Sequence, residues 1–216
     1  MKLRTLFVFL FIAVLKLYSQ KIVSLQSFAK VNFSTTNYKN EYTNVFGHPF
    51  ITDSFRVGKI LNSSGELFSA VKIKFDICSK QLLVETNDSI LIPDMSLVGS
   101  FEMDSIDSRG TEYYKRIFYK NNVGYYQILE RGKAFLYLLK TKSIKSSAKR
   151  EFVYSETFYI SINNGSFQKL KNNKKGILNA FPNNHYYLEL YIQSHQLNIN
   201  KFNDLRKLVA YYNRLK

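Results

Sequence analysis

The sequence predicts a mainly β protein of the α+β class. We expect an antiparallel β-sandwich, roll or partly open barrel, with a C-terminal helical segment packed on the sheet. Three observations predict this class. Apolar residues alternate with period two in many short segments of residues 56–171, turn signals separate these segments, and apolar positions in residues 172–216 recur at three- and four-residue steps.

Residues 1–19 are predicted to be a secretory signal peptide, followed by a single β-rich domain over residues 20–216. Lys2 and Arg4 form a positive start, an apolar run follows, and cleavage is expected between Ser19 and Gln20. The apolar run covers ten residues, whereas a bilayer span needs about 20. We therefore expect an exported protein, periplasmic, outer-membrane associated or extracellular, without a transmembrane span in the mature chain.

The first part of the domain predicts a polar lead-in followed by a block of strands. Residues 21–45 are rich in Asn, Ser and Thr, and we expect residues 20–55 to form a loosely structured lead-in with room for one strand. The strand signals that follow are AVKIKFDI (70–77) and KQLLVE (80–85), expected to pair as a hairpin, then SILI (89–92), which ends at Pro93, and SLVGSFEMD (96–104).

A second block of strands is expected from Tyr113 to Ile162. EYYKRIFYK leads through NNVG (121–124) into YYQILER, and AFLYLLKT and REFVYSETFYISI follow. The sequence NNGS (163–166) then predicts a turn into FQKL. The Asn and Gly residues of both turns are expected to supply the positive φ angles that tight hairpins require.

Three short helices are predicted in residues 172–216. They are NNKKGILNAF, ended by Pro182, HYYLELYIQS (185–194) and NINKFNDLRKLVAYYNRLK (198–216). In the last helix we expect Asn200 as the N-cap and Asp204 near the positive end of the helix dipole, with Arg214 and Lys216 at the negative end.

The last helix is basic and aromatic, so it predicts either a binding surface or a packing helix. Its apolar positions are Phe202, Leu205, Leu208, Val209, Tyr212 and Leu215. This spacing favours a helix that packs on the sheet, with Tyr211, Arg206 and Lys207 facing outward.

The known catalytic motifs that we considered are missing. The sequence has no G-x-S-x-G elbow, H-E-x-x-H motif or phosphate-binding loop. The three histidines, His48, His185 and His195, are isolated and predict surface or structural roles rather than a metal site. Cys78 is expected to be a half-buried small hydrophobe, and a nucleophilic role would require a base such as His48 beside it.

Acidic residues provide two weak candidate sites. The loop DSIDSRGTE contains Asp104, Asp107, Gly110 and Glu112, but Arg109 and the spacing favour a solvated loop over a calcium site.

Glycoside cleavage needs only two carboxylates at the right separation. The first acids to inspect for such a pair are Asp53, Asp76 and Glu130, for which turn chemistry and solvation are the ordinary explanation. The sequence therefore predicts no cofactor, no metal and no specific catalytic residue.

The formal charge of +15 has two explanations. It predicts either a polyanionic partner or a composition bias in which Lys rises together with Asn, Ile, Tyr and Phe. We favour the bias, because the lysines are spread over the chain. Removal of Lys2, Arg4 and Lys16 with the signal peptide lowers the charge to +12. Export also argues against nucleic acid as a partner.

Several segments together resemble a family of small secreted β-rich proteins from Bacteroidota. They are FGHPFITDSF…GKI, VKIKFDICSKQLLV (71–84), YYQILERGKAFLYLLK (125–140) and KKGILNAFP…LELYIQ…FNDLRKLVAYYN. The resemblance covers nearly the whole mature chain and implies a location in the bacterial envelope. It transfers no catalytic residues.

We therefore expect an exported, non-catalytic binding or structural module of the cell envelope, whose partner is a protein, a glycan or an anionic lipid. The alternative is a glycan-acting hydrolase with paired Asp or Glu. A hydrolase should show a concave pocket with two acids of perturbed pKa, and a binding module should show a flat or grooved patch of Tyr and Lys without such a pair.

Overall fold

A computed structural model describes residues 22–23, 35–87, 89–105, 110–146, 149–171 and 173–215. The predicted signal peptide, its Ser19–Gln20 junction, Asp107 and Lys216 lie outside the described residues. No helix in the described ranges is both long and apolar enough to cross a membrane.

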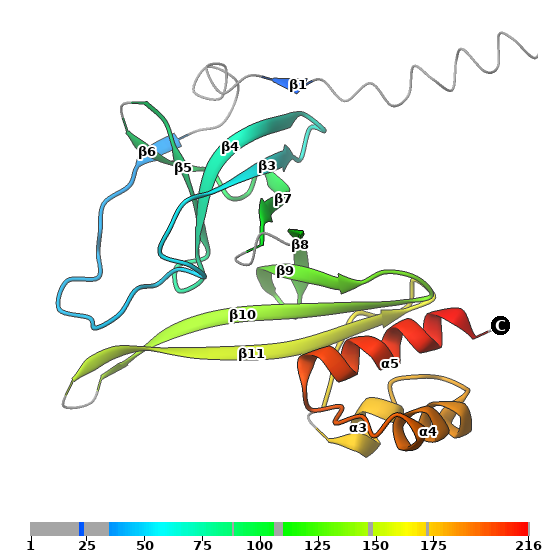
Figure 1. The fold of residues 1–216 in the computed structure, drawn as a ribbon. Coiled ribbons are helices and arrows are strands. Elements are labelled where there is room, and N and C mark those ends of the chain that lie inside the picture. Colours follow the sequence, from blue (N-terminus) through cyan, green and yellow to red (C-terminus); the bar gives the residue numbers. More distant parts are fainter. Residues whose placement is uncertain are drawn as a thin grey trace, which may run out of the picture.

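The described strands form one open sheet, in the order β12-β11-β10-β9-β8-β7-β3-β4-β5-β6-β2, with β1 beside β4 (Figure 1). All pairings are antiparallel except that of β1 with β4. This confirms the mainly antiparallel class. The strands are β1 (Ile22–Val23), β2 (Thr35–Asn37), β3 (Arg56–Asn62), β4 (Leu67–Asp76), β5 (Gln81–Glu85), β6 (Ile90–Pro93), β7 (Val98–Asp104), β8 (Thr111–Tyr119), β9 (Asn122–Glu130), β10 (Ala134–Ser146), β11 (Arg150–Ile162) and β12 (Gln168–Lys169).

Two hairpin turns with Asn and Gly were predicted. The predicted position of one turn is correct, and that of the other is wrong. Asn163 and Asn164 have φ angles of 51° and 56°, as predicted for the NNGS turn. Between β8 and β9, however, Lys120 and Asn121 occupy the left-handed region, so the turn begins before NNVG. Gly124 lies inside β9, where an added Cβ would be 3.1 Å from the Tyr126 ring. Close packing, rather than turn geometry, explains this glycine.

Three C-terminal helices follow the strands, as predicted. They are α3 (Lys174–Leu178), α4 (His185–Ser194) and α5 (Phe202–Arg214). Figure 1 shows α5 lying along the β10–β11 hairpin, with α4 on the side of α5 away from the sheet. This confirms the prediction that a C-terminal helix packs on the sheet.

Two details of α5 differ from the prediction. Lys201, not Asn200, is the N-cap, and no side chain caps the helix; the Asp204 carboxylate instead accepts a hydrogen bond from Asn198 N–H at 3.1 Å. Tyr211 does not face outward. Its ring stacks on Tyr191 of α4 with centroids 4.0 Å apart, because position 211 lies on the flank of α5 that meets α4. Arg206 and Lys207 are exposed as predicted.

Two large groups of buried apolar side chains hold the molecule together. The strand core consists of residues from β3 to β9 and the β4–β5 turn, and its members are Ile60, Phe68, Val71, Ile73, Phe75, Ile77, Leu82, Val84, Val98, Phe101, Met103, Tyr114 and Tyr125. The helix-covered core lies between the sheet and the helices, and its members are Leu129, Ala134, Leu136, Leu138, Ile160, Leu170, Ile177, Leu178, Phe181, Leu188, Ile192, Ile199, Leu205, Leu208, Val209 and Tyr212. Phe202 is half-buried against the second core.

Part of the lead-in is fastened across the long β10–β11 hairpin. We call residues 42–50 the strap. The Phe46 N–H donates to the Arg150 carbonyl at 2.9 Å, and the Phe152 N–H donates to the Phe46 carbonyl at 3.3 Å. Lys142 of β10 donates to the carbonyls of His48 and Phe50 at 2.7 and 2.9 Å. The strap is therefore held by backbone pairing and by one lysine, rather than being loosely structured.

Candidate functional site

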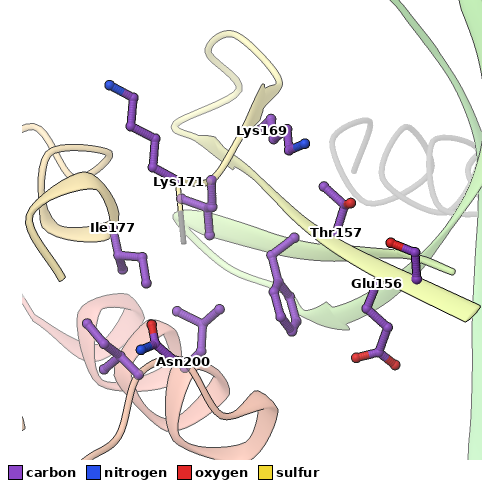
Figure 2. A pocket seen from close by; sticks show the side chains of 11 residues that line it. Glu156, Thr157, Lys169, Lys171, Ile177 and Asn200 are labelled. Carbon is purple, nitrogen blue, oxygen red and sulfur yellow. The ribbon is translucent and has the colours of Figure 1, made fainter. Parts of the chain in front are cut away.

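A hollow with a volume of ≈ 450 Å³ lies beside strand β11. We call it the β11 cavity. It is enclosed by the outer edge of β11, by β12, by α3 and by the loop that leads into α5 (Figure 2). The site therefore lies where the sheet meets the helical segment.

The cavity exists because β11 is longer than its outer partner. Strand β12 pairs with β11 only at Tyr159 and Ile160, and the Leu170 N–H donates to the Phe158 carbonyl at 2.9 Å. Towards the strap, the next backbone partner that the structure describes for this edge is Phe46, opposite Glu151. Between these two contacts, the outer edge of β11 lies beside an open space. The helical segment borders this space on its other side.

The cavity has an apolar floor and a polar rim. The floor is formed by the buried side chains of Leu170, Ile177, Ile199 and Leu205 and by half-buried Phe158. The rim is formed by Ser155, Glu156, Thr157, Lys169, Lys171 and Asn200. In Figure 2, Ile177 and Asn200 lie across the hollow from Thr157 and Glu156, and the amines of Lys169 and Lys171 project outward.

The rim contains two ammonium groups and one carboxylate. Neither Lys169 nor Lys171 makes an ion pair among the residues that the structure describes. The Glu156 carboxylate instead accepts a hydrogen bond from the Tyr154 hydroxyl at 2.5 Å. The rim therefore has a net positive charge that no side chain in the described part of the chain neutralises.

The three acids singled out in the sequence lie outside this cavity, and each has its own partner. Asp53 pairs with Lys74 at 2.8 Å, and this hydrogen bond lowers the pKa of the Asp53 carboxyl. Glu130 pairs with Arg206 at 3.2 Å. Among its described lining residues the β11 cavity thus contains one acid, Glu156, and does not show the pair that glycoside cleavage requires.

Asp76 is a buried structural acid. Its side chain is 1% exposed and accepts hydrogen bonds from the Tyr42 hydroxyl at 2.7 Å and from the N–H groups of Cys78 and Ser79 at 2.8 and 2.9 Å. It thereby joins the β4–β5 turn to the strap. Burying a carboxylate is costly unless hydrogen bonds compensate for it, and here three do.

The cysteine and the histidines show no activated chemistry. Burial and the nearby Asp76 raise the pKa of the Cys78 thiol, which is the opposite of what a nucleophile needs. Burial and Lys142 lower the pKa of His48. The His185 ring contacts the Phe181 carbonyl at 2.7 Å, and the His195 ring packs against Tyr191.

In the described part of the candidate calcium loop, Asp104 and Glu112 take part in a network of hydrogen bonds and ion pairs. The Asp104 carbonyl accepts a hydrogen bond from Arg56 at 2.5 Å, and the Glu112 carboxylate contacts Arg56, Lys140 and Tyr114 at 3.2, 3.5 and 3.0 Å. Gly110 lies at the start of the turn into β8. Within the described residues, no three His, Cys, Asp or Glu side chains come together in a metal-binding group.

No protein-family model matches the chain, and comparison with curated proteins and with solved structures gives no significant match. The resemblance to secreted Bacteroidota proteins therefore rests on the sequence segments alone.

Proposed function

We propose that this protein is an exported, non-catalytic binding module of the cell envelope, and that the β11 cavity is its binding site. The observation that carries the proposal is the lining of this cavity, which combines an apolar floor with two unpaired lysines and a single acid. Its ligand is an amphipathic envelope molecule with an apolar part and an anionic group. Anionic lipids belong to this class.

The volume of the cavity, ≈ 450 Å³, agrees with such a ligand. Binding pockets for small molecules commonly have volumes of about 300–1,000 Å³. Burial of a short alkyl group on Leu170, Ile177 and Leu205 would provide the affinity, at about 0.8 kcal/mol for each buried methylene. Lys169 and Lys171 would favour an anionic end group at the mouth.

The alternative, a glycan-acting hydrolase, needs a second carboxylate across from the first. In the β11 cavity, the labelled residues on the side opposite Glu156 are Ile177 and Asn200, neither of which is an acid (Figure 2). The same purified protein tests this alternative. Release of reducing sugar from envelope glycans, lost in a Glu156→Gln variant, would favour the hydrolase over the binding module.

The binding proposal is tested by blocking the mouth of the cavity. Asn200 is exposed and lines the cavity, so Asn200→Trp should fill the entrance without disturbing the core. Its matched control is Asn203→Trp, at an exposed position of α5 that does not line the cavity. Laurate binding, followed by displacement of anilinonaphthalene sulfonate, should weaken about ten-fold or more, about 1.4 kcal/mol, in Asn200→Trp only.

A charge variant separates the two parts of the site. Replacing Lys169 and Lys171 together by Gln should reduce laurate binding while leaving dodecanol binding unchanged, because only laurate carries a charge. The proposal is wrong if laurate binds equally to Asn200→Trp and to its control, or if it does not bind to the wild-type protein at all.

A further inference from the structure

A second hollow lies on another part of the sheet and has a different character. It has a volume of ≈ 370 Å³ and is lined by residues of the β4–β5 turn, the start of β5, the β6–β7 loop, β8 and β9, most of them polar. We call it the Arg116 cavity. It shares no lining residue with the β11 cavity. The residues that matter for its chemistry are Ser79, Lys80, Gln81, Ser96, Arg116 and Tyr125.

Arg116 has an unusual position in this cavity. Its side chain is half-buried, and its Nε atom is buried without a hydrogen-bond partner. No hydrogen bond or ion pair joins its guanidinium to any residue that the structure describes. Arg56 also has an unpaired Nε, but its terminal amines bond to Glu112 and to the Asp104 carbonyl. Leaving a half-buried guanidinium without partners is costly, so its free donors indicate a ligand.

A second cation lies beside Arg116. Lys80 is exposed at the tip of the β4–β5 turn, in the left-handed conformation with φ of 63°, and it has no ion-pair partner in the described ranges. The lining also includes the polar residues Ser79, Gln81 and Ser96, and the Ser79 hydroxyl donates to the Gln81 side-chain oxygen at 3.3 Å. Among the described residues, no Asp or Glu lines the cavity. Two cations in a lining that also contains neutral polar side chains form a suitable environment for an anion.

The carboxylate of Asp94, which interacts electrostatically with Arg116, is already hydrogen-bonded. Asp94 lies in the loop that carries Ser96, and its carboxylate accepts the Ser96 N–H at 2.8 Å. The pKa of Asp94 is lowered first by its hydrogen bonds from Ser96 and only then by the charge of Arg116. Asp94 thus stays ionised near Arg116 without forming an ion pair with it.

Two structural devices hold the walls of the cavity in place. Buried Asp76 fixes the β4–β5 turn by accepting the Cys78 and Ser79 N–H groups. The Tyr125 hydroxyl donates towards the carbonyls of Met95 and Val98, at 2.8 Å each, and so holds the β6–β7 loop over strand β9. Because both walls are tied to the strand core, the site is formed before any ligand arrives, which reduces the entropic cost of binding.

From these observations we propose that the Arg116 cavity binds a tetrahedral oxyanion, the phosphate or sulfate group of a polar molecule. The planar guanidinium of Arg116 would contact two oxygens of the anion, and Lys80 would supply a second charge from the turn. The volume exceeds that of a lone oxyanion, so part of the molecule that carries it also fits. This site is independent of the ligand proposed for the β11 cavity.

The test is a calorimetric titration of the purified mature protein with inorganic phosphate and with sodium sulfate, at constant ionic strength set by sodium chloride. We expect saturable one-to-one binding of at least one anion. Arg116→Gln should weaken it about ten-fold or more, and Arg116→Lys, which keeps the charge but loses the planar fork, should have an intermediate effect. Lys115→Gln is the matched control, since it removes one charge from the exposed neighbouring position of β8.

A second variant and a vesicle-binding assay complete the test. Lys80→Gln lies in an exposed turn, so it tests the site even if Arg116→Gln does not fold. Vesicles of phosphatidylglycerol distinguish a lipid headgroup from a soluble phosphate: Arg116-dependent vesicle binding supports the former, and phosphate binding without vesicle binding supports the latter. Two results would overturn the proposal: non-saturable binding, or equal anion affinity in Arg116→Gln, Lys80→Gln and Lys115→Gln. Either result shows that the anions only screen the net positive charge of the protein.

Discussion

The two cores of this protein differ in what they enclose. The helix-covered core consists of apolar side chains and Tyr212. The strand core borders on charged groups: Arg56 and Glu112 form an ion pair with side chains only 8% and 15% exposed, and Tyr114 donates to the same carboxylate. One half therefore depends on buried apolar area, whereas the other half also depends on each polar group having its partner.

The helix-covered core should be the most sensitive to a buried charge. Leu208 is 0% exposed, so Leu208→Asp places a carboxylate among apolar side chains. We expect a loss of at least about 4 kcal/mol, enough to unfold a marginally stable domain. The measurement is urea unfolding followed by circular dichroism.

The control for this change is Asn203→Asp, which adds the same side chain to an exposed position in the first turn of α5. It should be neutral or slightly stabilising, because the helix dipole favours an anion there. Leu205→Asp should behave like Leu208→Asp. If either core variant stays folded and only ligand binding is lost, α5 is a binding surface rather than a packing helix.

The strand core should respond most strongly to the loss of one member of its ion pair. Glu112→Ala leaves Arg56 without its carboxylate in a nearly buried position, and we expect a loss of about 3 kcal/mol. Glu85→Ala is the matched control, since its partner Lys72 is 63% exposed, and it should cost less than about 1 kcal/mol. Similar unfolding midpoints for the two variants would contradict this difference.

Alkaline pH should weaken the strand core through its tyrosines. Burial raises the pKa values of Tyr114 and Tyr125 above the usual value of 10.0. The folded protein thus favours the neutral phenols, so their contribution to stability is complete below pH 10 and is lost as the pH rises towards the folded-state values. Urea midpoints measured from about pH 8 to about pH 11 should fall mainly above pH 10. A flat profile would argue against this linkage.

The smallest expected effect concerns a single hydroxyl. Tyr114→Phe keeps the ring, which stacks on Phe101 at 4.9 Å, and removes the hydrogen bond to Glu112. We expect a loss of about 1 kcal/mol at neutral pH. The same variant should also show a shallower fall in stability above pH 10, which distinguishes loss of the ionisable group from a general packing defect.

The elements that could be predicted from the sequence are those with a local cause. Period-two alternation identified β4, the apolar segment after it was predicted to be its hairpin partner β5, and helical spacing identified α4 and α5 with bounds close to the observed ones. The β8–β9 turn was misplaced because Gly124 looked like a turn residue, although its small size matters for the Tyr126 ring. A glycine needed for a turn and a glycine needed for close packing look the same in the sequence. Only the neighbouring strand in the folded protein distinguishes them.

The candidate sites could not be predicted, because their residues are distant in the sequence. Glu156, Lys171 and Asn200 belong to a strand, a loop and a pre-helical turn, and only the early end of β12 brings them around one hollow. Arg116 belongs to no sequence motif. Its candidate role rests on the missing hydrogen-bond partner of its buried Nε atom, which only the folded structure reveals. The strap was also hidden, since the pairing of Phe46 with β11 spans about a hundred positions of the chain.

The strap has a consequence for the behaviour of the protein in concentrated solution. An unpaired strand edge is a template on which another chain can add by backbone hydrogen bonding, which leads to aggregation. Phe46 covers the edge of β11 near the tip of the hairpin, and β12 covers it near the base. What remains open is a short interval, too limited to support a long foreign strand. The lead-in segment therefore acts as a guard against edge-to-edge self-association.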